Sequence, residues 1–250
     1  MFAPVASKRL YEQVATQIRQ LISAGEIGAG HRLPAEKELA RQLGVSRPTV
    51  REAMIALEIA GLIEVRTGSG IYVSRPVESK PVVLDSGPGP FELLSARLLI
   101  EGEIAAEVAI RATAEDLVEI RHAALQMEQI SEEGGNYARA DQVFHVRIAT
   151  ATGNSVLAGL VDTLWGSMFN QMFNKLREHE EQTPEAKAKN LRDHRAIVDA
   201  LATRDALGSR TAMRQHLLRV QAALSGESDT EAVKVELPVE AAVLAPQLSR

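Results

Sequence analysis

Several features that define other classes of protein are missing from this chain of 250 residues. Without cysteine it can form neither disulfides nor thiolate metal sites, so a transition metal would have to be held by histidine and carboxylate side chains. No apolar run approaches the roughly 20 residues that span a bilayer, and residues 1–10 lack the apolar segment of a signal peptide. We therefore expect a cytoplasmic protein that makes no contact with a membrane.

The net charge of −5 is unevenly distributed along the chain. Residues 1–80 hold 11 lysines and arginines against 8 aspartates and glutamates, which gives +3. Residues 81–250 hold 17 against 25, which gives −8. Because a polyanion attracts a basic surface and repels an acidic one, only the first part is expected to approach nucleic acid.

Proline and glycine mark a boundary between two expected domains. The stretch PVESKPVVLDSGPGP, residues 76–90, contains these residues at a density that helices and central strands do not tolerate, and we interpret it as a linker. It separates an N-terminal domain, residues 1–75, from a C-terminal domain, residues 91–225. The last residues, 226–250, show no sustained helical period, and we expect a mobile or loosely packed tail.

Residues 34–60 have the pattern of two short helices joined by a tight turn, after a first helix expected near residues 10–24. Leu39 and Leu43 belong to the buried face of the first of these two helices, and Gly44 supplies the turn. Ser46 is placed to cap the second helix. This arrangement predicts a helix-turn-helix.

The second helix carries polar residues on the face opposite its core. Arg47 and Arg51 project from this face, and arginine can pair bidentately with guanine in the major groove. Two strand patterns, at residues 61–66 and 71–73, flank the turn TGSG at residues 67–70 and predict a wing. Each arginine alone is equally compatible with a solvated helix face, but the ordered set of helices, turn and hairpin favours DNA binding.

Residues 8–75 resemble the winged helix-turn-helix domain of the GntR family of transcription regulators, through this order of helix, turn, Val-Ser-Arg, second helix and glycine-tipped wing. The resemblance implies a double-stranded DNA operator as partner. Lysine stands at position 37, where the family commonly has arginine, and lysine is better suited to phosphate than to a base. The residues implied to bind DNA are Lys37, Ser46, Arg47, Thr49, Arg51, Thr67 and Gly68.

The C-terminal domain has apolar spacing typical of helices along almost its whole length. Thr113, Asn154 and Asp205 are expected N-caps, because their side-chain oxygens can accept from first-turn amides. Six antiparallel helices would form a bundle, so the expected fold class is mostly α with one small β-hairpin. The helices are expected near residues 91–112, 114–132, 137–152, 154–181, 185–203 and 205–224.

Four potential metal ligands lie on three of these expected helices. Asp141 and His145 are one turn apart and project from the same helix face among apolar neighbours. His194 and His216 lie on two further helices, each among aliphatic residues, so the four side chains can converge in the bundle core and bind a divalent metal. Each histidine alone is more often a hydrogen-bonded core or surface residue, and Asp141 with His145 alone would equally form an ordinary ion pair.

Residues 90–222 resemble the FCD effector-binding domain of the FadR-type branch of the GntR family. The Asp-x-x-Phe-His segment and two later histidines match that family's metal site, which implies that Asp141, His145, His194 and His216 bind the metal. Zinc is the first choice of metal, with nickel, manganese and iron as alternatives. Three histidines match no such position and are interpreted as structural or surface residues: His31, His122 and His179.

Arg97 stands on an otherwise apolar, alanine-rich helix, where its burial is costly without a partner. It either bridges to Glu101, one turn further on, or binds an effector carboxylate bidentately beside the metal. Asn190, one turn before His194, is a candidate donor to effector hydroxyls. Five residues are interpreted as bundle core rather than as a ligand platform: Trp165, Met168, Phe169, Met172 and Phe173.

Four segments resemble repressors of hexuronate utilisation within this branch: RLYEQ at 9–13, VRTGSGI at 65–71, GPFELL at 89–94 and ATGNS at 151–155. This implies a homodimeric, non-enzymatic repressor of sugar-acid catabolism that a hexuronate releases from its operator. Two alternatives remain open: a regulator with a structural metal that responds to another organic acid or acyl ligand, and a metal-dependent hydrolase. The hydrolase leaves the winged helix unexplained, and no positioned base or nucleophile accompanies the metal ligands.

Overall fold

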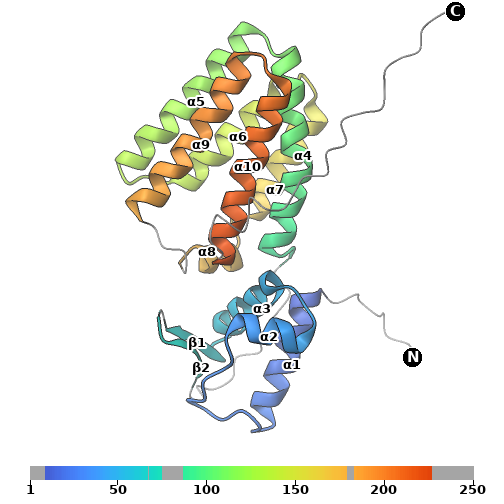
Figure 1. Ribbon diagram of the computed structural model, residues 1–250, viewed down its shortest axis with the longest axis vertical. Coiled ribbons are helices and arrows are strands. Elements are labelled where there is room, and N and C mark those ends of the chain that lie inside the picture. Colours follow the sequence, from blue (N-terminus) through green and yellow to red (C-terminus); the bar gives the residue numbers. More distant parts are fainter. Residues whose placement is uncertain (1–8, 67, 75–86, 179–182, 227–250) are drawn as a thin grey trace, which may run out of the picture.

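The computed structural model of the chain describes residues 9–66, 68–74, 87–178 and 183–226. These residues form two groups of elements, one above the other in the view of Figure 1. The N-terminal group combines three helices with a two-stranded hairpin, and the C-terminal group is a bundle of helices. The predicted fold class is therefore confirmed. Several earlier predictions lie wholly or partly outside the described residues: Thr67, His179, residues 179–181 of the helix predicted over 154–181, residues 76–86 of the linker and residues 227–250 of the tail.

The N-terminal group has the predicted helix-turn-helix and wing. The turn between the second and third helices is made by Gly44, whose φ of 65° is a left-handed conformation that favours glycine. Ser46 caps the third helix as predicted, because its side chain accepts from the backbone N–H of Thr49 at 3.2 Å. The elements are α1 (Leu10–Ser23), α2 (Glu36–Leu43), α3 (Arg47–Ile59), β1 (Ile63–Arg66) and β2 (Gly70–Val73).

The wing is an antiparallel pair of short strands. Ile63 pairs with Val73 at its base and Arg66 with Gly70 near its tip. Ile63 and Val73 are buried against the helices, which anchors the hairpin to the domain. The tip residue Gly68 is exposed, as the DNA-binding prediction for it requires.

Within the described residues the C-terminal group has seven helices, one more than predicted. The predicted N-caps are confirmed, because the side chains of Thr113, Asn154 and Asp205 accept from first-turn backbone amides. The helices are α4 (Pro90–Arg111), α5 (Ala114–Glu132), α6 (Tyr137–Thr150), α7 (Ser155–Ser167), α8 (Gln171–Glu178), α9 (Pro184–Ala202) and α10 (Ala206–Ser225).

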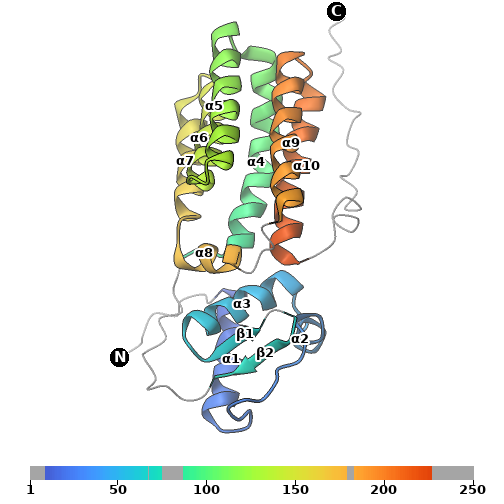
Figure 2. The same ribbon diagram turned by 90° about the vertical axis from the view of Figure 1, so that its left-hand side faces the viewer.

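The additional helix arises because the single helix predicted over residues 154–181 is wrong. Asn170 interrupts it, since its side chain accepts from the backbone N–H of Phe173 at 2.7 Å and caps α8. The same side chain donates to the carbonyl of Ser167 at 2.9 Å, where α7 ends. Figure 2 shows the result, with α8 lying across the end of the bundle that faces the N-terminal group.

The core of the bundle contains most of the residues assigned to it from the sequence. Trp165, Met168, Met172 and Phe173 are buried, as predicted. Phe169 departs from the prediction, because 38% of it is exposed. It lies in the short break between α7 and α8, where the helical period on which the prediction rested no longer applies.

In both views α3 is the N-terminal element closest to the bundle (Figures 1 and 2). It contacts α8, α4 and α10. No helix among the described residues combines the length and the apolar character that crossing a membrane requires.

Candidate functional site

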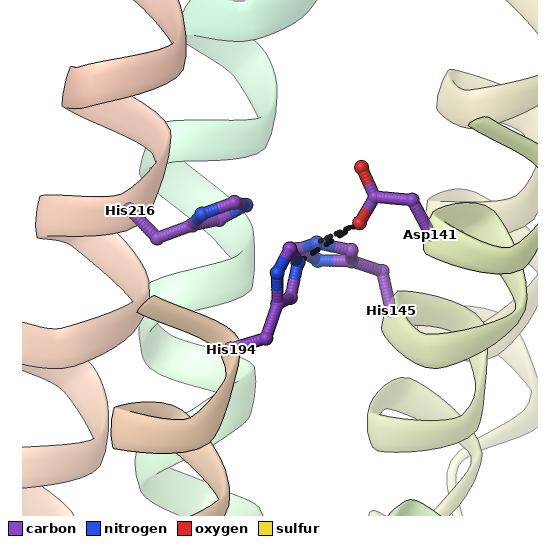
Figure 3. Close-up of side chains that lie close together, drawn as sticks. All are labelled: Asp141, His145, His194 and His216. Carbon is purple, nitrogen blue, oxygen red and sulfur yellow. Dashed lines mark hydrogen bonds and ion pairs between the residues drawn. The ribbon is translucent and has the colours of Figure 1, made fainter. Parts of the chain in front are cut away.

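The four predicted metal ligands converge in the interior of the bundle. Asp141 and His145 come from α6, His194 from α9 and His216 from α10, and their side chains point toward one another (Figure 3). One potential ligand atom from each lies within 4.8 Å of those of the others. All four residues are buried. The prediction that three helices bring these residues together is therefore matched by the geometry.

Helix periodicity explains why these polar side chains face inward. Asp141 and His145 share a face of α6 with the buried side chains of Phe144 and Ile148. His216 belongs to the buried face of α10, between Met213 and Leu217. The polar cluster is thus surrounded by apolar packing, which excludes water and strengthens interactions between charges.

Hydrogen bonds fix the orientation of two of the imidazole rings. His194 Nδ1 donates to the backbone carbonyl of Asn190 at 2.9 Å, which turns Nε2 toward Asp141 Oδ1 at 3.0 Å. His145 Nδ1 donates to Glu101 Oε2, which turns its Nε2 toward the same Asp141 oxygen at 3.2 Å. A ring that donates from one nitrogen to an oxygen presents the other nitrogen as a ligand, which is the usual arrangement of a metal-binding histidine.

Glu101 connects this cluster to Arg97. Its carboxylate accepts from Arg97 Nε at 2.6 Å through one oxygen and from His145 through the other. Burial alone would raise the pKa of Glu101, but the charge of Arg97 and the hydrogen bond from His145 outweigh it and lower the pKa to about 2. Glu101 is therefore an anion that holds both neighbours in place.

Asp193 has a similar position behind His216. Its Oδ2 accepts from Arg219 Nε at 2.6 Å and lies 3.9 Å from His216 Nδ1, which is too far for a hydrogen bond. Burial, followed by the charge of His194, lowers the pKa of His216 to about 3. His216 is therefore neutral at physiological pH, the form in which imidazole binds a metal.

The residues present fit a divalent metal ion. Two buried imidazole nitrogens, His145 Nε2 and His216 Nδ1, have no hydrogen-bond partner among the described residues. Burial tends to raise the pKa of Asp141, but His194, through its charge and hydrogen bond, and the nearby His145 hold it well below its usual range, so the carboxylate is ionised. Three imidazoles and one carboxylate are a donor set that suits zinc and neighbouring divalent metals.

Arg97 and Trp165 form a buried pair beside the cluster. Only 2% of Arg97 is exposed, and its guanidinium lies 4.0 Å from the centre of the Trp165 ring. Arg97 Nη1 contacts only a weak acceptor in the described hydrogen bonds, Met168 Sδ at 3.4 Å. The Trp165 ring is 5.2 Å from that of His145, and Trp165 Nε1 has no hydrogen-bond partner within the described part of the chain. Both side chains thus keep donor capacity next to the cluster.

The predicted DNA-binding residues lie at the start of α3, in α2 and in the wing. Lys37, Ser46 and Gly68 are exposed, and the Oγ1 atom of Thr49 is 2.7 Å from the Ser46 hydroxyl. Arg51 is not fully free in solvent, because its Nη1 lies 3.3 Å from the carboxylate of Glu36.

Arg47 also has partners within the chain. Its Nε lies 3.6 Å from the same Glu36 oxygen, and its Nη2 donates to the carbonyl of Gly226 at 3.4 Å. The two arginines are therefore side by side, as DNA reading would require, but both already contact protein atoms.

Two protein-family models match the chain. "Bacterial regulatory proteins, gntR family" matches residues 10–73, and "FCD domain" matches residues 92–219. This chain belongs to the gntR family of bacterial regulatory proteins. The assignment confirms the prediction of a transcription regulator rather than an enzyme, and it removes the hydrolase alternative.

Relatives of this GntR regulator resemble it over most of their length. It is 41% identical over 230 residues to the "Uxu operon transcriptional regulator" of Escherichia coli strain K12, covering 88% of this chain and 89% of the relative. It is 36% identical over 231 residues to the "Exu regulon transcriptional regulator" of the same strain, covering 90% and 88%. Among solved structures, "Streptococcus agalactiae GntR" matches at 29% identity with a TM-score of 0.46, covering 84% of this chain and 98% of that chain.

Sequence reasoning placed the candidate metal ligands of the GntR regulator together but missed two of their neighbours. Glu101 was considered only as a partner for Arg97, and Trp165 only as core. The sequence carries a partial signal for Glu101, because a buried carboxylate one turn after a buried arginine needs a further partner. Asn190 reaches the cluster through its backbone carbonyl, which a side-chain pattern does not reveal.

Proposed function

We propose that this GntR regulator is a homodimeric repressor that a sugar acid, of the hexuronate class, releases from its operator. The observation that carries the proposal is the buried cluster of Asp141, His145, His194 and His216 with the donors of Arg97 beside it. Support for the ligand class comes from the four segments that resemble hexuronate repressors and from relatives named for the Uxu operon and the Exu regulon.

Asp141, His145, His194 and His216 would hold a divalent metal ion. When bound, the metal supplies a Lewis-acidic centre for an oxygen ligand, and four protein ligands leave positions on a five- or six-coordinate ion. Glu101 orients His145, and the Asn190 carbonyl orients His194. These contacts prepare the ligand nitrogens before the metal arrives.

Arg97, which contacts Glu101, and Trp165, which lies beside His145, would bind the sugar acid. A guanidinium recognises a carboxylate through parallel N–H donors, and Arg97 retains such donors beyond those that Glu101 occupies. Trp165 Nε1 can donate to a sugar hydroxyl, which would satisfy a buried donor. The amide of Asn190 stays a candidate donor to another hydroxyl.

The two-fold symmetry of a homodimer would place two α3 helices on a pseudo-palindromic operator. Arg47, Thr49 and Arg51 would read base edges, and Lys37 with the wing residues Thr67 and Gly68 would contact the backbone. The sugar acid regulates only if its affinity differs between the DNA-bound and free conformations, and a coupling of about 1 to 3 kcal/mol is sufficient.

Operator binding measured with and without sugar acids tests the proposal. The duplex is taken from the promoter region of the protein's own gene. Operator affinity is measured over a series of salt concentrations, with and without galacturonate or glucuronate. We expect either acid to weaken specific binding at least about fivefold, as the coupling above implies. The neutral sugars galactose and glucose are the matched control, because they lack the carboxylate. Unchanged operator affinity across all sugar acids would remove the ligand assignment.

A further inference from the structure

The recognition helix α3 is docked on the bundle rather than turned away from it (Figure 2). Ile55 and Ala56 of α3 are buried in this arrangement. Glu58 near the end of α3 lies 3.6 Å from Lys175 of α8, which pairs the two elements electrostatically. The contact that holds α3 to the bundle therefore includes a charged pair.

A second contact joins α3 to the start of α4. Glu52 is buried, and its Oε1 accepts from the backbone N–H of Phe91 at 2.8 Å. This N–H belongs to the first turn of α4, where helices leave donors unpaired and attract negative charge. Docking of α3 thus satisfies a buried donor of the bundle.

The DNA-reading arginines meet the end of α10. Arg47 Nη2 donates to the Gly226 carbonyl at 3.4 Å, and Arg51 Nη1 lies 3.1 Å from where a Cβ on Gly226 would be. Gly226 is the left-handed cap that ends α10, with a φ of 67°. Because the last carbonyls of a helix carry a partial negative charge, the guanidinium groups are attracted to this end.

These contacts satisfy the arginines only in part. Glu36 of α2 offers one carboxylate to both, at 3.3 and 3.6 Å. The Nε atoms of Arg47 and Arg51 are buried without a hydrogen-bond partner among the described residues. The Glu36 carboxylate and the Gly226 carbonyl thus occupy the arginine donors that phosphate and base oxygens would occupy on DNA. They form fewer hydrogen bonds than a bidentate contact with a base allows.

We propose that the C-terminal end of α10 competes with DNA for Arg47 and Arg51, so that the docked arrangement of α3 is an autoinhibited state that the operator must displace. The inference rests on the proposed role of these arginines in reading the operator. A guanidinium N–H that donates to Gly226 cannot donate to DNA at the same time. The bundle lies next to α3, the helix that carries both arginines (Figure 1).

The same helix connects this contact to the metal-ligand cluster. His216 lies on α10, ten residues before Gly226, which corresponds to about 15 Å along a helix. A change in the position of α10 at His216 is therefore transmitted to the carbonyl that Arg47 contacts. For a sugar acid at the cluster to weaken operator binding, as proposed above, it must favour the docked state of α3 through this one rigid element.

The absence of cysteine allows the docked state to be locked chemically. The full-length variant Glu58→Cys/Lys175→Cys places one thiol on α3 and one on α8, and a short bis-maleimide joins them. If at least nine-tenths of the protein is cross-linked, we expect operator affinity to fall about tenfold or more, because only the undocked fraction binds. The single variant Lys175→Cys, treated with the same reagent, is the matched control and should bind as before treatment.

Two outcomes separate this inference from the proposed function. Equal operator affinity before and after cross-linking would overturn autoinhibition and leave operator reading intact. Failure of the untreated protein to bind its operator would overturn the proposed function and the inference with it.

A reciprocal measurement uses the rate of cross-linking. If the operator and the α10 end compete, saturating operator should slow cross-linking of the double-cysteine variant several-fold, since linkage is reciprocal. A scrambled duplex of equal length at the same concentration is the control and should slow it less. A rate that the operator leaves unchanged would show that α3 stays docked on DNA and would contradict the inference.

Discussion

At the scale of single residues, Glu101 is a buried carboxylate whose charge depends on two partners. It is a buried anion that accepts from Arg97 on its own helix and from His145 on α6. Removing one member of such a buried network leaves the others charged and unpaired, which costs more than the contact itself contributes. The consequences of changing Glu101 should therefore appear at the cluster of candidate metal ligands.

Glu101→Gln should lower the affinity for zinc about 10- to 100-fold, the range typical of residues that orient a metal-binding histidine. The amide keeps an acceptor for His145 but loses the charge that stabilises the ring. The measurement is competition with a chromophoric chelator, with circular dichroism to check folding. Glu103→Gln is the control, because Glu103 is exposed on the same helix and pairs with Arg210. Equal zinc affinity in Glu101→Gln and the parent would remove this role.

Glu52 should make the stability of the protein depend on pH. Burial raises the pKa of Glu52 from 4.5 to about 7. The hydrogen bond from the Phe91 N–H lowers this pKa in part, and repulsion from Glu92 raises it further. A raised pKa means that the folded state holds the proton more tightly, so the contribution is fully present below about pH 4.5 and is lost as pH rises through 7. The loss is at most about 3 kcal/mol.

Glu52→Gln should flatten this dependence, because the amide keeps an acceptor for Phe91 and cannot ionise. Urea unfolding at pH 5.5 and pH 8 measures the difference for parent and variant. Glu103→Gln serves for comparison, since Glu103 is exposed and pairs with Arg210 rather than facing Glu52. Parallel stability curves for the parent and Glu52→Gln would show that Glu52 does not titrate in this range.

Residue patterns predict the convergence of the four candidate metal ligands better than they predict the residues around them. Asp141 and His145 are recognisable in the sequence as a pair because they share one face of α6. Glu101 lies on a different helix, α4, so its contact with His145 depends on how the two helices pack. Trp165 has the spacing of a core residue and is buried, so the unpaired Nε1 atom beside His145 becomes visible only when α7 is packed against its neighbours.

At the scale of elements, the break between α7 and α8 shapes the surface on which α3 docks. Hydrophobic spacing continues from residue 154 to 181, so periodicity alone predicts one helix. The cap by Asn170 redirects the chain, and α8 then presents Lys175 to α3. Capping residues inside an apolar period are hard to recognise, because asparagine also occurs within helices at a small cost.

Asn170→Ala should reduce the free energy of unfolding by about 1 kcal/mol, the usual cost of losing a helix cap. Denaturant titration measures it. Asn174→Ala is the control, because Asn174 is exposed inside α8 and alanine is the better helix former there. A loss as large in Asn174→Ala as in Asn170→Ala would contradict the capping role.

At the scale of the whole molecule, a metal in the cluster would join three helices of the bundle. α6, α9 and α10 each contribute a ligand, and without a cation their buried imidazoles and carboxylate face one another. A ligand that binds only the folded state stabilises it by mass action.

Metal removal should therefore lower the melting temperature of the protein. A stabilisation of about 3 kcal/mol, as for a metal at 100 to 1,000 times its dissociation constant, corresponds to several degrees in a chain of this size. Calorimetry before and after dialysis against a chelator measures the shift, and added zinc should reverse it. His216→Ala should show little change on chelation. A parent protein that melts at one temperature in both buffers would count against a resident metal.

The placement of the N-terminal group on the bundle was beyond the reach of sequence patterns. Arg47 and Gly226 are 179 positions apart, and nothing in their local sequence relates them. The helices of each group follow from hydrophobic spacing and caps, but the contact between the groups depends on α8, through Lys175, and on polar atoms at the ends of α4 and α10.

The left-handed cap at Gly226 places a constraint on chain length. One residue inserted between His216 and Gly226 would rotate the end of α10 by about 100° and advance it by about 1.5 Å, which moves the terminal carbonyl away from Arg47 while His216 stays in place. The number of residues between His216 and Gly226 therefore fixes where the terminal carbonyl of α10 lies relative to His216. Connecting loops elsewhere can change length with less effect. We therefore expect related chains to differ in length in their loops and not between His216 and Gly226.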